Sequence, residues 1–343
     1  MASYDFLFDG MGMRDWCDAA GSSAPTSMAD LLAQASGEEA KVTAWEFPFP
    51  SLDALNEACG QVPETRDLTK GLEDGFLAIK DTLRFVLDPI TEPLSWLLDG
   101  ALHLAQVTPW WIVIPLLLLV TYLISRSWPL VIGVAASIMG LAFIDHYDYA
   151  IQTLSIIFVC AAICVALGVP IGIAMSRSDR LQRMTIPVLD MLQTLPTFVY
   201  LIPLIFLFSV TESKLYGIAI ILYAIVPVVR LTDLGIRMVD KEVLEAAQAF
   251  GMTPRQKLYQ VQIPLALPNI MAGVNQTIMM SLAMVVIASL VSAPGLGVLV
   301  LRGIRSLELG VGLVAGLGIV ILAIILDRVT KSALARVNAA QKS

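Results

Sequence analysis

Seven long apolar segments dominate this chain and limit the folds that it can adopt. A helix needs about 20 apolar residues to cross the hydrocarbon core of a bilayer, with a range of about 17–25. The runs are continuous rather than alternating, which indicates helices and not the strands of a membrane barrel. We therefore predict an all-α integral membrane protein with about seven spans. The segments lie at residues 108–124, 129–144, 149–174, 187–209, 216–232, 269–291 and 310–327.

The composition supports a membrane protein and indicates its sidedness. Charged residues make up only 15% of the chain, whereas soluble domains hold about a quarter. Residues 1–107 carry 18 acidic and 6 basic side chains, and residues 108–343 carry 11 acidic and 16 basic ones. An acidic N-terminal region joined to a basic membrane body favours an N-terminus on the outer side.

The region before the first span divides into two parts. Residues 1–70 are acidic and predict a loosely structured periplasmic segment, in which Cys17 and Cys59 can pair if the compartment is oxidising. The sequence leaves that pairing open. Residues 71–107 show helical periodicity but are too charged to span a bilayer, and two prolines, Pro89 and Pro93, divide them. Amphipathic helices in the membrane interface and a small soluble helical hairpin both fit this pattern.

A polar stretch at residues 239–264 separates the fifth and sixth apolar segments. Glu245–Ala249 are strong helix formers, and Gly251 is a natural helix stop. Thr253 before Pro254 predicts an N-cap followed by a first-turn proline. Charged and amide side chains cannot lie in hydrocarbon without large cost. We predict two short helices on a membrane surface that dock a soluble partner.

This stretch resembles a known motif. Glu-Ala-Ala at 245–247, Gly251, and Val-Gln-Ile-Pro at 261–264 resemble the EAA loop of bacterial ABC importer permeases, whose usual ending is Ile-x-Leu-Pro. Over residues 60–335 the chain is similar to the permease subunit of the glycine betaine/proline betaine transporter. The resemblance implies a MetI-like transmembrane bundle over residues 108–335 and a cytoplasmic loop seated on an ATPase subunit. The residues that it assigns to this coupling are Glu245, Ala246, Ala247, Gly251, Thr253, Pro254, Val261 and Pro264.

The resemblance also implies partners, a solute class and a location. The partners are a second permease copy, two cytoplasmic ATPase subunits that bind ATP and Mg, and a periplasmic solute-binding protein, with no nucleic acid. The solute is a methylated amine such as glycine betaine, proline betaine, choline, carnitine or trimethylamine N-oxide. The location is the bacterial inner membrane, with the N-terminus periplasmic and the tail at 336–343 cytoplasmic. Because the chain has no GxxxxGK[ST] motif and only two histidines, we expect no ATP hydrolysis, cofactor or metal site of its own.

Loop charges lead separately to the same sidedness. Arginine and lysine gather in the short loop at 125–127, at 176–183, in the polar stretch and at the C-terminus. With seven spans these four regions fall on one side, which the positive-inside rule makes cytoplasmic.

Polar side chains within the spans are the candidates for a solute path. A path for a zwitterion needs a polar lining without strong fixed charge, and the alternative role is hydrogen bonding between helices. The candidate lining residues are Gln193, Thr194, Asn275, Gln276 and Ser281. By contrast, Asp190, Arg230, Asp233 and Arg237 are expected to form ion pairs at the cytoplasmic interface.

The second functional hypothesis is an ion-coupled secondary transporter of small zwitterions. Such a transporter needs central carboxylates and often shows repeated halves, and neither is evident in this sequence.

Overall fold

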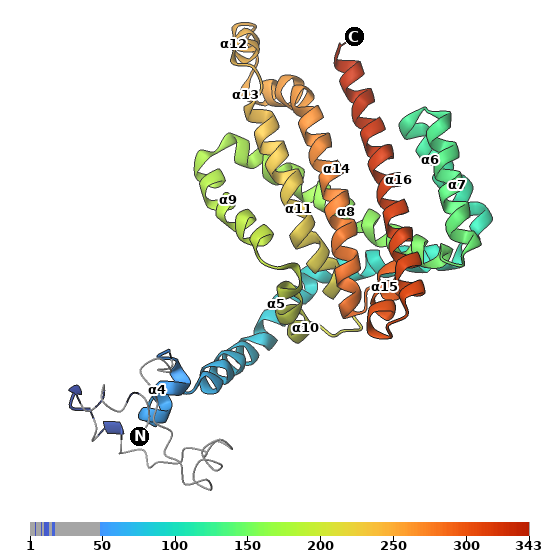
Figure 1. Cartoon of the computed structure of the whole chain (residues 1–343). Coiled ribbons are helices and arrows are strands. Elements are labelled where there is room, and N and C mark those ends of the chain that lie inside the picture. Colours follow the sequence, from blue (N-terminus) through green and yellow to red (C-terminus); the bar gives the residue numbers. More distant parts are fainter. Residues whose placement is uncertain (1–3, 5–7, 9, 14–15, 18–48, 343) are drawn as a thin grey trace. The chain divides into compact units, whose positions relative to one another are not determined.

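The computed structural model describes residues 4, 8, 10–13, 16–17 and 49–342, and these residues form helices without any strand (Figure 1). They fall into two units, one ending at Leu83 and the other beginning at Arg84. The all-α membrane fold predicted from the apolar segments is confirmed.

The described part of the first unit is packed around a disulfide bond. Cys17 and Cys59 are bonded, and Tyr4 and Phe8 are buried with them. Helix α4 (Leu52–Ala58) follows an N-cap at Ser51 and packs on this cluster. The pairing that the sequence left open therefore forms, and the described part is more ordered than expected. The rest of the predicted N-terminal region, residues 1–3, 5–7, 9, 14–15 and 18–48, lies outside the described residues.

Helix α5 (Thr65–Val107) is a single helix that runs through Pro89 and Pro93. The prediction that these prolines divide the stretch was wrong. Proline removes one backbone hydrogen bond and usually kinks a helix, but packing holds this helix beyond both of them. Leu98 is fully buried, and a Cβ atom on Gly217 would lie only 2.6 Å from its Cδ1.

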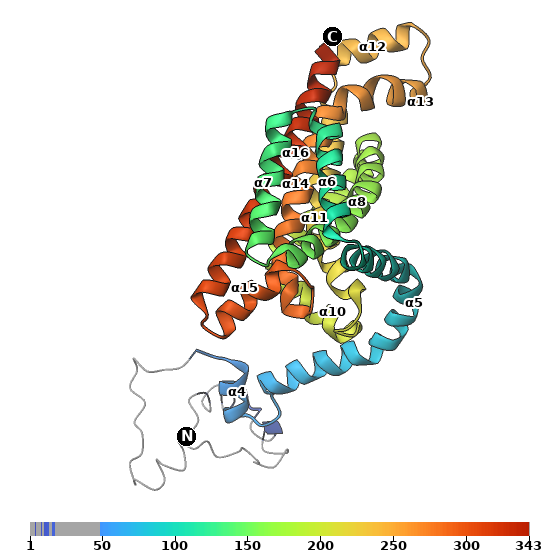
Figure 2. The ribbon, with the colours of Figure 1, turned by 90° about the vertical axis from the view of Figure 1, so that its right-hand side faces the viewer.

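The second unit is a bundle of long helices that lie side by side (Figures 1 and 2). Four described stretches are long and apolar enough to cross a membrane, or up to six if each of two bent helix pairs counts as one span. Helix α7 is apolar but only 16 residues long. Six of the seven predicted segments correspond to α6 (Trp110–Ser125), α7 (Trp128–Phe143), α8 (Tyr147–Arg177), α11 (Ser213–Arg237), α14 (Ile263–Ala288) and α16 (Leu309–Lys342).

The fourth predicted segment is not one continuous helix. Helix α9 (Asp179–Thr194) ends before Pro196, and the short helices η1 (Thr197–Tyr200) and α10 (Leu201–Leu207) continue at an angle of 104°. The residue before a proline avoids helical backbone angles, and Leu195 is extended, with φ −64° and ψ 132°.

Two predicted loops are largely helical as well. Between α8 and α9 the expected loop at 176–183 shrinks to Ser178, whose Oγ accepts a hydrogen bond from Leu181 N at 3.3 Å. The glycine-rich segment 292–309 contains helix α15 (Leu296–Arg305).

Small residues let α8 and α14 approach α11 closely. A Cβ atom on Gly172 of α8 would lie 2.7 Å from the carbonyl oxygen of Val229. On α14, a Cβ atom on Gly273 would lie 3.0 Å from Val228 Cα. Without a hydrophobic driving force between helices in lipid, such close backbone packing is a main source of helix association. Helix α11 is therefore the centre of the bundle.

The basic regions gather at one end of the bundle. The loop between α11 and α14 lies there with the C-terminal end of α16, whereas α10 and α15 lie at the opposite end (Figures 1 and 2). At the first end, Arg336 donates to Leu123 O at 2.8 Å, which places the α6–α7 junction beside the C-terminus. The predicted grouping of the four basic regions agrees with this arrangement.

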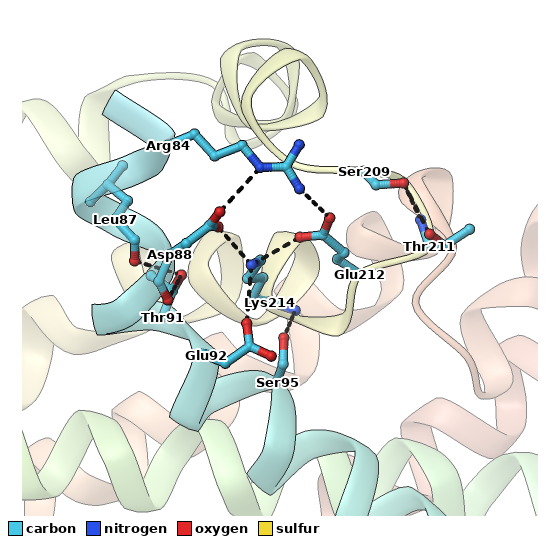
Figure 3. A network of polar contacts seen from close by, with 10 residues as sticks. All are labelled: Arg84, Leu87, Asp88, Thr91, Glu92, Ser95, Ser209, Thr211, Glu212 and Lys214. Carbon is cyan, nitrogen blue, oxygen red and sulfur yellow. Dashed lines mark hydrogen bonds and ion pairs between the residues drawn. The ribbon is translucent and has the colours of Figure 1, made fainter. Parts of the chain in front are cut away.

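A polar network at the opposite end joins α5 to the start of α11 (Figure 3). The Lys214 side chain is only 5% exposed, and its Nζ lies 2.8 Å from Asp88, 3.3 Å from Glu92 and 3.0 Å from Glu212. Arg84 bridges Asp88 and Glu212 at 3.2 and 2.8 Å. These groups line a cavity of about 420 Å³. Three carboxylates therefore converge on one buried cation, and they fasten residues 84–107 to α11.

Candidate functional site

The polar loop at residues 239–264 begins with a capped helix. Helix α12 (Lys241–Ala249) starts after Asp240, whose Oδ1 accepts a hydrogen bond from Glu242 N at 2.9 Å. An aspartate at this position satisfies one of the free N–H groups of the first turn and favours the positive end of the helix dipole.

Gly251 makes the turn that ends α12. Its φ is +78°, in the left-handed region that glycine adopts without penalty. Gly251 N donates to Gln248 O at 2.9 Å, and Met252 N donates to Ala247 O at 3.2 Å. These two bonds form a Schellman motif, which closes the helix end. The predicted stop at Gly251 is confirmed.

A second short helix follows the turn. Helix α13 (Pro254–Lys257) begins with a capping box between Thr253, its N-cap, and Gln256. Thr253 N donates to Gln256 Oε1 at 2.9 Å, and Gln256 N donates to Thr253 Oγ1 at 3.4 Å. The predicted N-cap and first-turn proline are confirmed. A π-helical turn, η2 (Leu258–Gln262), then leads into α14 without a break, and such turns often occur at functional sites.

Most of the residues predicted to make the docking contact lie on the surface. The exposed ones are Glu245, Ala246, Gly251, Thr253, Pro254 and Pro264. Val261 is half-buried in η2. Ala247 is buried and packs the loop from within.

The sequence reasoning missed one prominent side chain. Phe250, directly before Gly251, is 86% exposed, and Val243 and Tyr259 on the same loop are also exposed. Exposed aromatic side chains in a polar loop are typical of protein contacts. A phenylalanine among helix-forming polar residues was the available signal.

The candidate path residues fall into two groups. Gln193 and Thr194 are exposed at the end of α9, immediately before the bend. On α14, Gln276 is exposed, whereas Asn275 is half-buried and accepts a hydrogen bond from Thr330 of α16. Ser281 is fully buried. Of the five candidate path residues, only Gln193, Thr194 and Gln276 are exposed.

The charged residues near the loop are paired, as predicted. Arg237 binds Asp179 at 2.7 Å and Asp233 at 2.9 Å, and Arg230 binds Asp190. None of these three contacts involves the loop helices themselves. The charges instead join α9 to the end of α11 that precedes the loop.

Comparisons with known proteins agree on the family. Residues 165–339, about half of the chain, match the family described as binding-protein-dependent transport system inner membrane component. The chain is 42% identical over 252 residues to the glycine betaine/proline betaine transport system permease protein ProW of Escherichia coli (strain K12), covering 73% of this chain and 70% of that protein. It is 40% identical over 247 residues to the glycine betaine/carnitine transport permease protein GbuB of Listeria monocytogenes serotype 1/2a (strain 10403S), covering 71% and 87%.

Two further similarities are more distant. The trimethylamine N-oxide transport system permease protein TmoV of Ruegeria pomeroyi (strain ATCC 700808 / DSM 15171 / DSS-3) is 35% identical over 260 residues, covering 75% of this chain and 39% of that protein. Among solved structures, an inward-facing MetNI methionine ABC transporter matches with a TM-score of 0.51 and 19% identity, over 56% of this chain and 95% of that chain. That structure shows the shared fold. The chain belongs to the family of inner membrane components of binding-protein-dependent transport systems, the permease subunits of bacterial ABC importers.

Proposed function

We propose that this chain forms the membrane path of an ATP-driven importer for betaine-type methylated amines. It works with a second copy of itself, with two cytoplasmic ATPase subunits and with a periplasmic solute-binding protein. The observation that carries this proposal is the capped, exposed loop at 239–264, which presents Phe250 beside the Gly251 turn. Because the chain has no phosphate-binding loop of its own, ATP and Mg bind to the partner that this loop contacts.

The solute class rests on the relatives. Those named for glycine betaine, proline betaine, carnitine and trimethylamine N-oxide all match this chain. These solutes share a small, fully methylated amine with a compensating negative charge. Quaternary ammonium groups are usually held by cages of aromatic side chains, and we assign that recognition to the solute-binding partner rather than to this chain.

The path itself is assigned to the exposed polar side chains. Gln193, Thr194 and Gln276 are neutral and exposed, so they can pass a zwitterion without trapping it. We assign Asn275 and Ser281 a supporting role and not a place in the lining. Asn275 accepts a hydrogen bond from Thr330 of α16, and Ser281 is fully buried.

Uptake by reconstituted vesicles tests the proposal. We expect vesicles that hold the chain with its ATPase to accumulate labelled glycine betaine only when ATP and the solute-binding protein are both supplied. Vesicles that hold the chain alone should show no uptake. Uptake by the lone chain under a sodium or proton gradient would instead establish an ion-coupled secondary transporter.

The proposed orientation places the N-terminus in the periplasm and the basic end of the bundle in the cytoplasm. Disulfide bonds persist in oxidising compartments and are rare in the cytosol, so the bond between Cys17 and Cys59 supports an outer location. The grouping of basic loops with the C-terminal end supports a cytoplasmic location for that end.

Thiol labelling of intact cells checks this orientation. In a variant with Cys160→Ala and Cys164→Ala, a membrane-impermeant maleimide should label nothing before reduction, because both remaining cysteines are bonded. After treatment with an impermeant reductant, the same reagent should label both Cys17 and Cys59. Labelling that requires permeabilised cells would contradict the proposed orientation.

A further inference from the structure

Three polar contacts fasten α9 to α11 at the end near the coupling loop, which is the loop at residues 239–264. Arg237, the last residue of α11, binds Asp179 Oδ1 through Nη1 at 2.7 Å. It also donates to Met175 O of α8 at 2.9 Å. One guanidinium therefore joins the end of α8, the start of α9 and the end of α11, two residues before the loop begins.

The other two contacts follow in antiparallel order along the same pair of helices. Gln182 Nε2 of α9 donates to Asp233 Oδ2 of α11 at 2.7 Å, and Asp233 Oδ1 accepts from Arg237 Nε at 2.9 Å. Further along, Asp190 near the end of α9 pairs with Arg230. As the residue numbers rise on α9 they fall on α11, so the contacts hold residues 179–190 of α9 against residues 230–237 of α11.

Apolar packing fills the space between these contacts. Met175, Leu189, Val226 and Val229 are buried together in one cluster, with Ile186 against it. Asp233 itself is only 7% exposed on its side chain. Packed helices that also share charged hydrogen bonds move as rigid bodies rather than deform, because dense interiors transmit displacement.

A continuous route leads from the coupling loop to this clamp. Helix α13, η2 and α14 run on without a break from Pro254. Helix α14 in turn packs tightly on α11, where a Cβ atom on Gly235 would lie 2.7 Å from Asn269 Cβ. A displacement of the loop therefore reaches α11 through close contacts, and reaches α9 through the clamp.

The clamp ends where the fourth segment breaks. Beyond Asp190, helix α9 stops at Thr194, and the chain turns by 104° through the extended Leu195 and Pro196. A helix break of this kind is a natural hinge, because Pro196 donates no backbone hydrogen bond across it. Gln193 and Thr194 therefore lie at the end of α9 next to this hinge, beyond the contacts that hold α9 to α11.

We propose that α9 and residues 226–237 of α11 form one lever that carries motion of the coupling loop to Gln193 and Thr194. Arg237, Asp190 and Arg230 are positioning residues in this lever, since they act on the path through α9. The inference rests on the proposed function, and it adds the part of the chain that converts ATPase motion into opening of the path.

A covalent tie within the lever tests whether it moves as one body. In the Cys160→Ala/Cys164→Ala background, Gln182→Cys and Asp233→Cys are joined by a short bifunctional thiol reagent. If α9 and α11 do not slide, the crosslinked protein should keep ATP-driven uptake within about twofold of its uncrosslinked form. Loss of uptake on crosslinking, with ATP hydrolysis retained, would overturn the proposal.

A charge reversal tests whether the clamp transmits motion. Asp190→Arg replaces a half-exposed ion pair by two like charges, and it should lower the solute moved per ATP hydrolysed by about fivefold while the ATPase stays bound and active. The double variant Asp190→Arg/Arg230→Asp restores the pair and should restore most of that ratio. Arg302→Gln, which removes the exposed pair with Glu308 at the opposite end, is the matched control and should change nothing.

The outcomes separate the two proposals. An unchanged ratio in Asp190→Arg would overturn the lever, and a variant that fails to assemble leaves the crosslinking result to decide. Because the parent protein is assayed in the same vesicles, failure of the proposed function appears as absent ATP-driven uptake in the parent. Failure of the lever appears only in the variants.

Discussion

Replacing Gly251 with valine is expected to lower ATP-driven uptake by about tenfold or more while leaving the protein in the membrane. Gly251 has a φ of +78°, and a Cβ atom there would meet no other atom within 4 Å. The penalty is therefore one of backbone conformation alone, and for a β-branched residue in the left-handed region it exceeds about 1–2 kcal/mol. The turn between α12 and α13 should open, so that α12, with Phe250 at its end, no longer keeps its position relative to α13. Each 1.4 kcal/mol lost from coupling lowers transport about tenfold.

Uptake and ATP hydrolysis should be measured in the same vesicles, with Gly251→Asn as the matched control. Asparagine tolerates the left-handed region better than any branched residue, so this variant should keep most of the uptake. Equal uptake by Gly251→Val and the parent would show that the turn is not needed to couple ATP hydrolysis to transport. Equal loss in both variants would point to the missing flexibility of glycine rather than to its positive φ.

Replacing Lys214 with methionine is expected to destabilise the second unit strongly. Lys214 is buried among Asp88, Glu92 and Glu212, and methionine keeps its apolar stem but not its charge. Removing the buried cation leaves three carboxylates close together, but Glu92 is 70% exposed and Arg84 still pairs with the other two. We therefore expect a loss of about 2–3 kcal/mol, at the lower end of the cost of breaking a buried ion pair. We expect the thermal unfolding midpoint in detergent to fall by on the order of 10 °C.

Lys331→Met is the matched control for that experiment. Lys331 also makes an ion pair, with Asp327 at 2.8 Å, but its side chain is 60% exposed. Exposed pairs contribute about 1 kcal/mol or less, so its unfolding midpoint should hardly move. Similar midpoints for the two variants would mean that water reaches the Lys214 cavity and screens its charges.

The sequence predicted the features of this protein that depend on local chemistry. Long continuous apolar runs in a membrane protein indicate helices, and the caps at Gly251 and Thr253 need only their neighbours in the chain. The break after Thr194 was also within reach, because Pro196 marks it. Its angle of 104° was not, since the packing of α9 on α11 sets it.

Features that depend on distant partners could not be predicted. Helix α5 continues through its prolines because Asp88 and Leu98 are held by residues more than 100 positions away. The sequence placed Arg237 in an ion pair, yet nothing local singles out Asp179, 58 positions earlier, as its partner. Phe250 was overlooked because helix propensity and caps explain the loop without it, although a phenylalanine in a polar loop was a signal that its exposure makes plain.

The two flanks of the coupling loop differ in stiffness. Toward α11 the chain leaves helical structure at Met238 and resumes it at Lys241. Toward α14 the helix is unbroken from Pro254 onward. A displacement at Phe250 therefore reaches α14 through the Gly251 turn and an unbroken helical stretch, and it reaches α11 through α12 and three non-helical residues. Because α14 continues the helical stretch that begins at Pro254, we expect its cytoplasmic end to follow the loop more closely than the end of α11 does.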